Sequence, residues 1–214
     1  HYELKERTPN SSARESYTSK DVFYLIMPDR FANGDEKNDS NKALIEKANR
    51  KSEGGRHGGD LRGIINNLDY LKNLGVTTLW LTPVCEDNEK AYTYHGYAQT
   101  DLYKIDARYG TNEEYRELST ELKKRDMKLV KDYVTNHWGV SHCWIHWFED
   151  GKNGFKRSNY RTNSQMNPYA ADVDKKVALD GWFDTTMPDL NQSNPLVLKY
   201  LIQKYPIQNL LQIN

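Results

Sequence analysis

Three short apolar segments alternate along this chain with stretches that repeat hydrophobic residues at helical spacing. The apolar segments cover residues 21–27, 76–81 and 127–134, and a proline or a polar cluster follows each of them. Short apolar runs that are bounded in this way are consistent with buried strands. The repeated strand–helix order favours right-handed parallel β–α–β units. The sequence therefore predicts an α/β fold.

Both segments between the predicted strands carry helix signals. Asp60 is suited to cap a helix in which leucine and isoleucine recur at helical spacing up to Gly75. Thr111 begins a second predicted helix, which reaches about Lys124 and has acidic residues in its first turn. Within the long loop that follows the first strand, we expect residues 41–50 to form one or two helical turns.

The later part of the chain is harder to assign. Residues 84–110 have the pattern of a long loop, and hydrophobic periodicity disappears between His137 and about Asn194. We interpret residues 137–190 as an inserted subdomain after the third strand. Another helix is expected to start at Pro195, because proline is favoured in the first turn of a helix.

Four polar strings stand at or near the ends of predicted elements. They are YLIMPDRFANGD at 24–35, YHGYAQTD at 94–101, DYVTNH at 132–137 and MPDLN at 187–191. In parallel α/β proteins, ligands collect beyond the carboxyl ends of the strands. The string DYVTNH directly follows the third predicted strand and therefore indicates one edge of an active site.

In this order, the four strings resemble the α-amylase family of glycoside hydrolases, family 13. They are most similar to its neopullulanase and cyclomaltodextrinase branch, and the resemblance covers about residues 17–204. It implies a TIM (β/α)8 barrel with a subdomain inserted after the third strand. A whole barrel usually needs roughly 250 residues. With 214 residues, the chain is expected to hold only the first three strands, as a partial barrel.

The resemblance also implies a division of the chain. Its parts are a linker at 1–20, three β/α units at 21–136 with a calcium loop at 32–60, subdomain B at 137–190, the start of the third barrel helix at 191–204, and an atypical tail at 205–214.

The loop after the first strand is rich in oxygen-bearing side chains. Hard oxygen ligands on a flexible loop are what Ca²⁺ prefers, although an Asx-rich turn without a metal explains the same composition. The spacing is not that of an EF-hand. The resemblance implies calcium and carries the ligand roles over to Asn33, Asp35, Asn38, Asp39, Gly58 and Asp60.

A second set of residues is suited to bind a sugar. Flat aromatic rings pack on pyranose faces, and the set consists of Tyr94, His95, Tyr97, Asp132 and His137. Taken alone, these residues are better explained as turn, core or capping residues. The resemblance implies that His95, Tyr97 and His137 bind the sugar at which the bond breaks. It also implies that Asp132 supports that site by hydrogen bonding.

Retaining glycosidases use two carboxyl groups, a nucleophile and a general acid, roughly 5–5.5 Å apart. In the family these follow the fourth and fifth strands, and their motifs do not occur in this sequence. The expectation is therefore a fragment, without catalytic residues or measurable activity, of a parent that hydrolyses α-1,4-glucosidic bonds in starch-derived glucans with retention. The alternatives are a non-catalytic calcium- and glycan-binding module, and an α-glucan transglycosylase or isomerase.

Charge and hydropathy argue against some partners. Lys plus Arg and Asp plus Glu both total 30, which gives no support to nucleic-acid binding. No apolar run approaches the ~20 residues of a membrane span, and the first 21 residues lack an apolar signal core. The resemblance implies a periplasmic or secreted location, and a parent that completes the barrel and is able to oligomerise.

A partial parallel sheet also leads to an expectation about folding. Three strands cannot close a barrel, so the side chains that would face its interior lack a covering layer. We expect an exposed apolar face on the first and third strands, and a chain that is prone to aggregate on its own.

Overall fold

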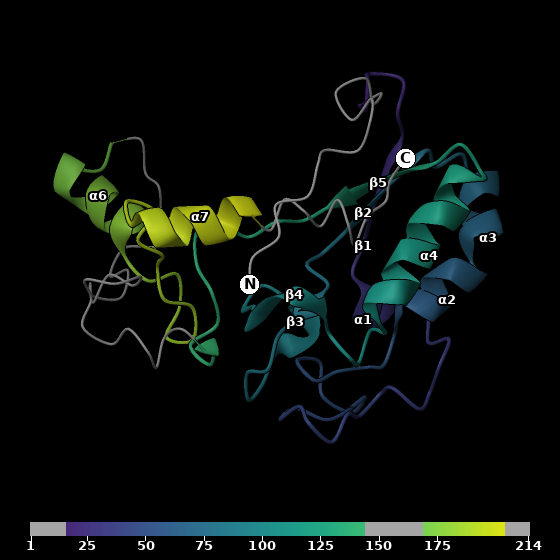
Figure 1. Cartoon of the computed structure of the whole chain (residues 1–214), viewed down its shortest axis with the longest axis horizontal. Coiled ribbons are helices and arrows are strands. Elements are labelled where there is room, and N and C mark those ends of the chain that lie inside the picture. Colours follow the sequence, from purple (N-terminus) through teal and green to yellow (C-terminus); the bar gives the residue numbers. More distant parts are fainter. Residues whose placement is uncertain (1–15, 144–168, 204–214) are drawn as a thin grey trace.

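The computed structural model describes residues 16–143 and 169–203. Most of the predicted linker, the tail at 205–214, and part of the predicted subdomain lie outside these described residues. Figure 1 shows the helices α2, α3 and α4 grouped on one side of the three-stranded sheet, while α6 and α7 lie at the opposite end of the molecule.

The central sheet is parallel, as the sequence predicts. Its strands are β1 (Phe23–Ile26), β2 (Thr78–Leu81) and β5 (Lys128–Lys131), in the order β1-β2-β5. Leu25 pairs with Trp80, which in turn pairs with Val130. The third strand is shorter than expected, because regular pairing ends at Lys131, before Asp132. Asp132 and the residues after it therefore leave the carboxyl edge of the sheet as a loop.

Helix capping follows the predicted signals. The Asp60 side chain accepts a hydrogen bond from Gly63 N at the start of α2 (Leu61–Asn66). The Thr111 side chain and Glu114 form a capping box at the start of α4 (Asn112–Lys123). Both helices begin where the sequence indicates because these polar side chains satisfy the otherwise unpaired N–H groups of the first turn.

The single helix expected after Asp60 is divided in two. At Asn67 the backbone leaves helical geometry, with φ −109° and ψ 12°, and α3 (Leu68–Asn73) follows. The Asn67 side chain donates a hydrogen bond to Gly63 O at 2.7 Å. Asparagine side chains compete with the backbone for such carbonyls, which weakens a helix at that point.

The main core lies between the sheet and the helices α2, α3 and α4. Tyr24 and Ile26 face this core from β1, as Leu79 and Leu81 do from β2. The other face of the sheet is apolar but open: Phe23, Leu25 and Trp80 are 42%, 57% and 40% exposed. This agrees with the expected exposed apolar face on the first strand and adds the second strand to it. The exposure expected of the third strand is not found, because all four residues of β5 are partly buried.

Two predictions for the loops are wrong. Residues 41–50 form no helix, because side chains bind their N–H groups: Ala43 N donates to Asn41 Oδ1 and Ala48 N to Ser40 Oγ. The segment 84–110 is more than a loop. It contains the short antiparallel strands β3 (Cys85–Glu86) and β4 (Asp101–Ile105), and the 3-10 turn η2 (Thr93–His95).

Short helices complete the described structure. The segment α1 (Pro28–Phe31) follows β1 directly, α6 (Asp172–Asp180) was not predicted, and α7 (Pro195–Gln203) begins at the predicted proline. A second apolar cluster joins α7 to β4 and to the segments around Trp138 and Leu190. In residues 16–143 and 169–203, no helix has the length and apolar character needed to cross a membrane.

Candidate functional site

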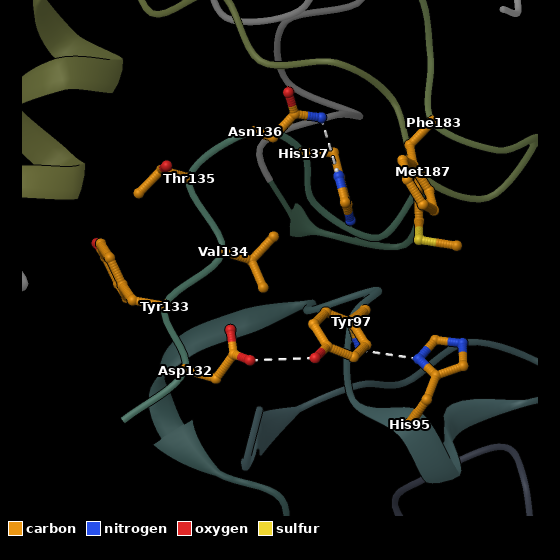
Figure 2. A pocket seen from close by; sticks show the side chains of 10 residues that line it. All are labelled: His95, Tyr97, Asp132, Tyr133, Val134, Thr135, Asn136, His137, Phe183 and Met187. Carbon is orange, nitrogen blue, oxygen red and sulfur yellow. Dashed lines mark hydrogen bonds between the residues drawn. The ribbon is translucent and has the colours of Figure 1, made fainter. Parts of the chain in front are cut away.

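A cavity of about 570 Å³ lies where β5 ends (Figure 2). Four of the five residues predicted to bind a sugar line it: His95, Tyr97, Asp132 and His137. They come from two separate parts of the chain, the loop between β3 and β4 and the loop after β5. Their meeting supports the expectation that ligands bind at the carboxyl edge of the sheet.

Asp132 and Tyr97 form the central polar pair of this cavity. Tyr97 Oη donates to Asp132 Oδ2 at 3.0 Å, and Trp80 Nε1 donates to the same oxygen at 3.3 Å. Burial and the neighbouring Asp132 charge raise the pKa of Tyr97 to about 12, so its hydroxyl remains a donor at neutral pH. Among the described residues, no hydrogen bond is formed to Asp132 Oδ1, which can therefore accept one from a ligand.

His95 is held by the backbone of its own turn. Tyr97 N donates to His95 Nδ1 at 2.9 Å, so the neutral ring carries its proton on Nε2. Gly96 makes this turn possible, because its φ is +76° and a Cβ there would lie 2.0 Å from Pro83 O. Burial lowers the pKa of His95, against the opposing effect of the Glu46 and Asp184 carboxylates.

We expect His95 to titrate below 6.5, the pKa of an ordinary histidine. The unfolded chain then takes up this proton before the folded chain does. The contribution of His95 to stability is therefore intact above pH 6.5 and decreases as the pH falls through the lowered pKa. Protonation also converts Nδ1 into a donor and breaks its bond with Tyr97 N. NMR titration of the imidazole carbons measures this pKa, with the urea-unfolded chain as the reference, and a folded-state value at or above the reference would contradict the expectation.

His137 lies between the loop after β5 and residues 183–190, which fold back against that loop. Asn136 Nδ2 lies 3.1 Å from His137 Nδ1, and the His137 ring stacks on Phe183 with centroids 4.9 Å apart. Phe183 and Met187 line the same cavity (Figure 2), and neither is among the site residues predicted from the sequence. Met187 begins the string MPDLN, which carries no site role by itself, and no local pattern marks Phe183. Both reach the cavity because residues 183–190 fold back in this way.

Tyr94 does not line this first cavity, although its ring contacts the His95 ring edge-on, with centroids 5.6 Å apart. It lines a second cavity of about 700 Å³, which shares His95 and Met187 with the first. The Arg30 guanidinium covers the Tyr94 ring at 4.3 Å from its centroid. The second cavity also includes Asp184 and Glu89, and thus continues the first one along the boundary with residues 140–141 and 184–187.

The predicted calcium ligands also meet in space. The buried Asp60 carboxylate accepts bonds from Gly34 N at 3.0 Å, Asp35 N at 2.9 Å and Asn38 Nδ2 at 3.1 Å, besides its cap bond. Asn33 Nδ2 donates to Asp39 Oδ1 at 2.6 Å. A Cβ at Gly58 would lie 2.5 Å from the same Asp39 oxygen, so all six residues belong to one compact loop.

The donor set of this loop fits a hard cation. Asn38 Oδ1 is buried and has no hydrogen-bond partner among the described residues. The side-chain amides of Asn33 and Asn38 donate their N–H groups to the carboxylates of Asp39 and Asp60. Rotating each side-chain amide by half a turn would exchange its nitrogen and oxygen, so that the oxygen would point toward the carboxylate and would be able to share a cation with it. The described residues include no cluster of three His, Cys, Asp or Glu side chains suited to hold a metal. Amide and carbonyl oxygens would therefore have to supply part of the ligand set, and Ca²⁺ accepts such ligands.

Comparison with known proteins gives one consistent result. A family profile described as "Alpha amylase, catalytic domain" matches residues 25–209. The cyclomaltodextrinase of Thermoanaerobacter pseudethanolicus is 35% identical over 191 residues, which are 87% of this chain and 32% of that protein. The β/α-amylase of Paenibacillus polymyxa is 33% identical over 192 residues, 87% of this chain and 15% of that protein.

Solved structures agree with this result. An Anoxybacillus α-amylase superimposes with a TM-score of 0.74 and 36% identity, over 91% of this chain and 39% of its own. The Geobacillus thermoleovorans α-amylase in complex with acarbose gives a TM-score of 0.68 and 32% identity, over 89% and 37%. The chain spans between 15% and 32% of the length of the two curated relatives named above.

Proposed function

The chain belongs to the α-amylase family of glycoside hydrolases, and on that premise we propose that it carries the glucan-binding part of an enzyme that hydrolyses α-1,4-glucosidic bonds with retention. In this proposal β1, β2 and β5 are the first three strands of the (β/α)8 barrel, and residues 137–190 are the inserted subdomain. The family match and the parallel strand order support this arrangement.

The observation that carries the proposal is the meeting of Tyr97, Asp132, His95 and His137 around one cavity. The Tyr97 ring offers a flat face for a pyranose. Asp132 Oδ1 accepts from a sugar hydroxyl, while Trp80 and Tyr97 hold the other carboxylate oxygen. Neutral His95 donates from Nε2. These groups bind and orient one glucosyl unit, and the catalytic carboxyl groups of the parent enzyme would act on it.

The second cavity favours an oligosaccharide over a single sugar. It joins the first at His95 and Met187, and together the two offer more space than one glucosyl unit requires. Tyr94 and Asp184 supply an aromatic ring and a carboxylate there, the groups that bind sugar faces and hydroxyls. We therefore propose linear or cyclic starch-derived glucans as the substrate class.

We propose Ca²⁺ for the loop at 32–60, held by Asn33, Asp35, Asn38, Asp39, Gly58 and Asp60. The buried, unpartnered Asn38 Oδ1 supports this choice. When bound, the ion would neutralise the carboxylates and join the two ends of the loop. Titration calorimetry with CaCl2 tests the proposal and is expected to show one site. The periplasmic or secreted location and the inactivity of this chain alone stay predictions.

Replacing Asp132 with alanine is expected to weaken maltotriose binding about 10- to 100-fold, because it removes a charged acceptor and releases the Tyr97 hydroxyl. Titration calorimetry at saturating CaCl2 measures the change. Asp69→Ala is the matched control, since Asp69 pairs with Arg125 and belongs to neither cavity. Equal affinities for the two variants would remove Asp132 from the site.

A further inference from the structure

A buried pair of opposite charges, Asp29 and Arg56, connects the predicted calcium loop, which contains Arg56, to the turn at Thr93 beside the glucan cavities. Arg56 Nε is 3.7 Å from Asp29 Oδ1, and both side chains are almost fully enclosed. Neither residue lines the cavities described above. Each of them, however, binds the backbone of a segment that does contribute to one of the two sites.

On the metal side, Asp29 fixes the backbone that leads to Asp60. Its carboxylate accepts from His57 N at 2.8 Å and from Gly58 N at 3.2 Å. Its carbonyl oxygen accepts from Gly59 N at 2.9 Å. Three successive N–H groups are thus bound to one residue. The orientation of the Gly58 carbonyl, a proposed calcium ligand, therefore depends on Asp29.

On the glucan side, Arg56 binds the first residue of η2. Arg56 Nη1 donates to Thr93 O at 3.1 Å and to Thr93 Oγ1 at 3.3 Å. The Glu46 carboxylate accepts from Thr93 N at 2.8 Å and from the Thr93 hydroxyl at 2.6 Å. The turn that begins at Thr93 contains His95 and ends with the bond from Tyr97 N to His95 Nδ1. Arg56 therefore holds the base of the turn that presents His95 and Tyr97.

Arg56 is poorly explained by stability alone. It is 0% exposed, and within residues 16–143 and 169–203 its Nε and Nη2 atoms form no hydrogen bond. The Arg56 guanidinium also packs on the face of the Tyr109 ring, with Cζ 4.5 Å from the ring centroid. Replacing buried charged residues by well-packed apolar side chains of similar volume is often neutral or stabilising. A role in positioning explains a buried arginine here, because Arg56 contacts both Asp29, which binds the calcium loop, and Thr93, which begins the turn with His95.

We infer that Asp29 and Arg56 are positioning residues that couple cation binding in the calcium loop to glucan binding at His95 and Tyr97. A cation that fixes Gly58 restricts Asp29, which restricts Arg56 and through it Thr93. Because such coupling is reciprocal, glucan binding must strengthen cation binding by the same factor. This inference rests on the proposed function, since it takes both sites as real.

The test measures maltotriose affinity of the full 214-residue chain by titration calorimetry, in saturating CaCl2 and in EGTA. The unmodified chain is expected to bind maltotriose about tenfold more tightly with CaCl2, within the usual range of coupling between sites. In Arg56→Met the ratio is expected to fall close to one. Arg125→Met is the matched control, because this arginine pairs with Asp69 and Glu121 away from both sites, and it should keep the full ratio.

Amide hydrogen exchange gives a second measurement that needs no sugar. CaCl2 is expected to slow exchange at residues 93–97 of the unmodified chain, and this protection should disappear in Arg56→Met. If Arg56→Met does not fold, Thr93→Val removes the hydroxyl contacts instead and is expected to reduce the protection in part. Protection confined to the calcium loop, or a calcium effect on maltotriose that persists in Arg56→Met, would overturn the inference.

The two proposals fail in different ways. If the unmodified chain binds no maltotriose in either buffer, the proposed glucan site is wrong. Calcium-dependent protection of residues 93–97 that requires Arg56 would still support the coupling. A loss of maltotriose affinity in Arg56→Met that is equal in CaCl2 and EGTA would instead show a structural role only, and would overturn it.

Discussion

Replacing Asp60 with alanine is expected to lower the free energy of unfolding by about 3–5 kcal/mol and to abolish calcium binding. The Asp60 carboxylate is fully buried and accepts four hydrogen bonds, from Gly34 N, Asp35 N, Gly63 N and the Asn38 amide. Loss of a helix cap costs about 1 kcal/mol, and each buried donor left without an acceptor costs about 1–3 kcal/mol. Urea unfolding monitored by circular dichroism measures the change.

Asp35→Ala is the matched control for this prediction. Asp35 is a proposed ligand of the same ion, yet in the part of the chain that the structure describes its side chain accepts only a local bond, from Lys37 N at 3.1 Å. We expect this variant to lose calcium binding while its stability in EGTA changes by less than about 1 kcal/mol. Equal destabilisation of the two variants in EGTA would contradict the role given to Asp60, and unchanged calcium binding in Asp35→Ala would contradict the ligand assignment.

The open face of the sheet leads to the second prediction, that this chain on its own binds hydrophobic dyes and self-associates. Phe23 and Leu25 on β1 and Trp80 on β2 are all exposed there, and Val130 continues the row of Leu25 and Trp80 across the sheet. At roughly 25 cal/mol per Å², even a few hundred Å² of uncovered apolar surface corresponds to several kcal/mol. That is comparable with the whole stability of a typical domain.

A urea melt followed by 1-anilinonaphthalene-8-sulfonate fluorescence, with light scattering, measures this behaviour. Leu25→Thr introduces a polar, β-branched side chain that suits a strand, and it is expected to reduce both dye binding and association. Ile45→Thr is the control, because Ile45 is 51% exposed but lies in a loop away from this face. A sharp transition of the unmodified chain without dye binding would show that the open face does not limit folding.

The sequence alone determined the features that depend on neighbouring residues. The capping box of Thr111 and Glu114 and the cap at Asp60 lie within four residues of the groups they bind, so their spacing was sufficient to predict the helix starts. The short apolar runs predicted three parallel strands, which the structure confirms. The ordered strings identified the family, because their residues are individually characteristic and need no geometry to be recognised.

Only the tertiary structure decided which of these residues meet. Tyr97 and Asp132 are 35 residues apart, and Phe183 follows His137 by 46 residues, so their contacts depend on the path of the whole chain. Tyr94 precedes His95 in the sequence and its ring contacts the His95 ring, yet Tyr94 lines only the second cavity, whereas His95 lines both. The link through Arg56 has no sequence signal at all, since a buried arginine is recognised only by the groups that surround it.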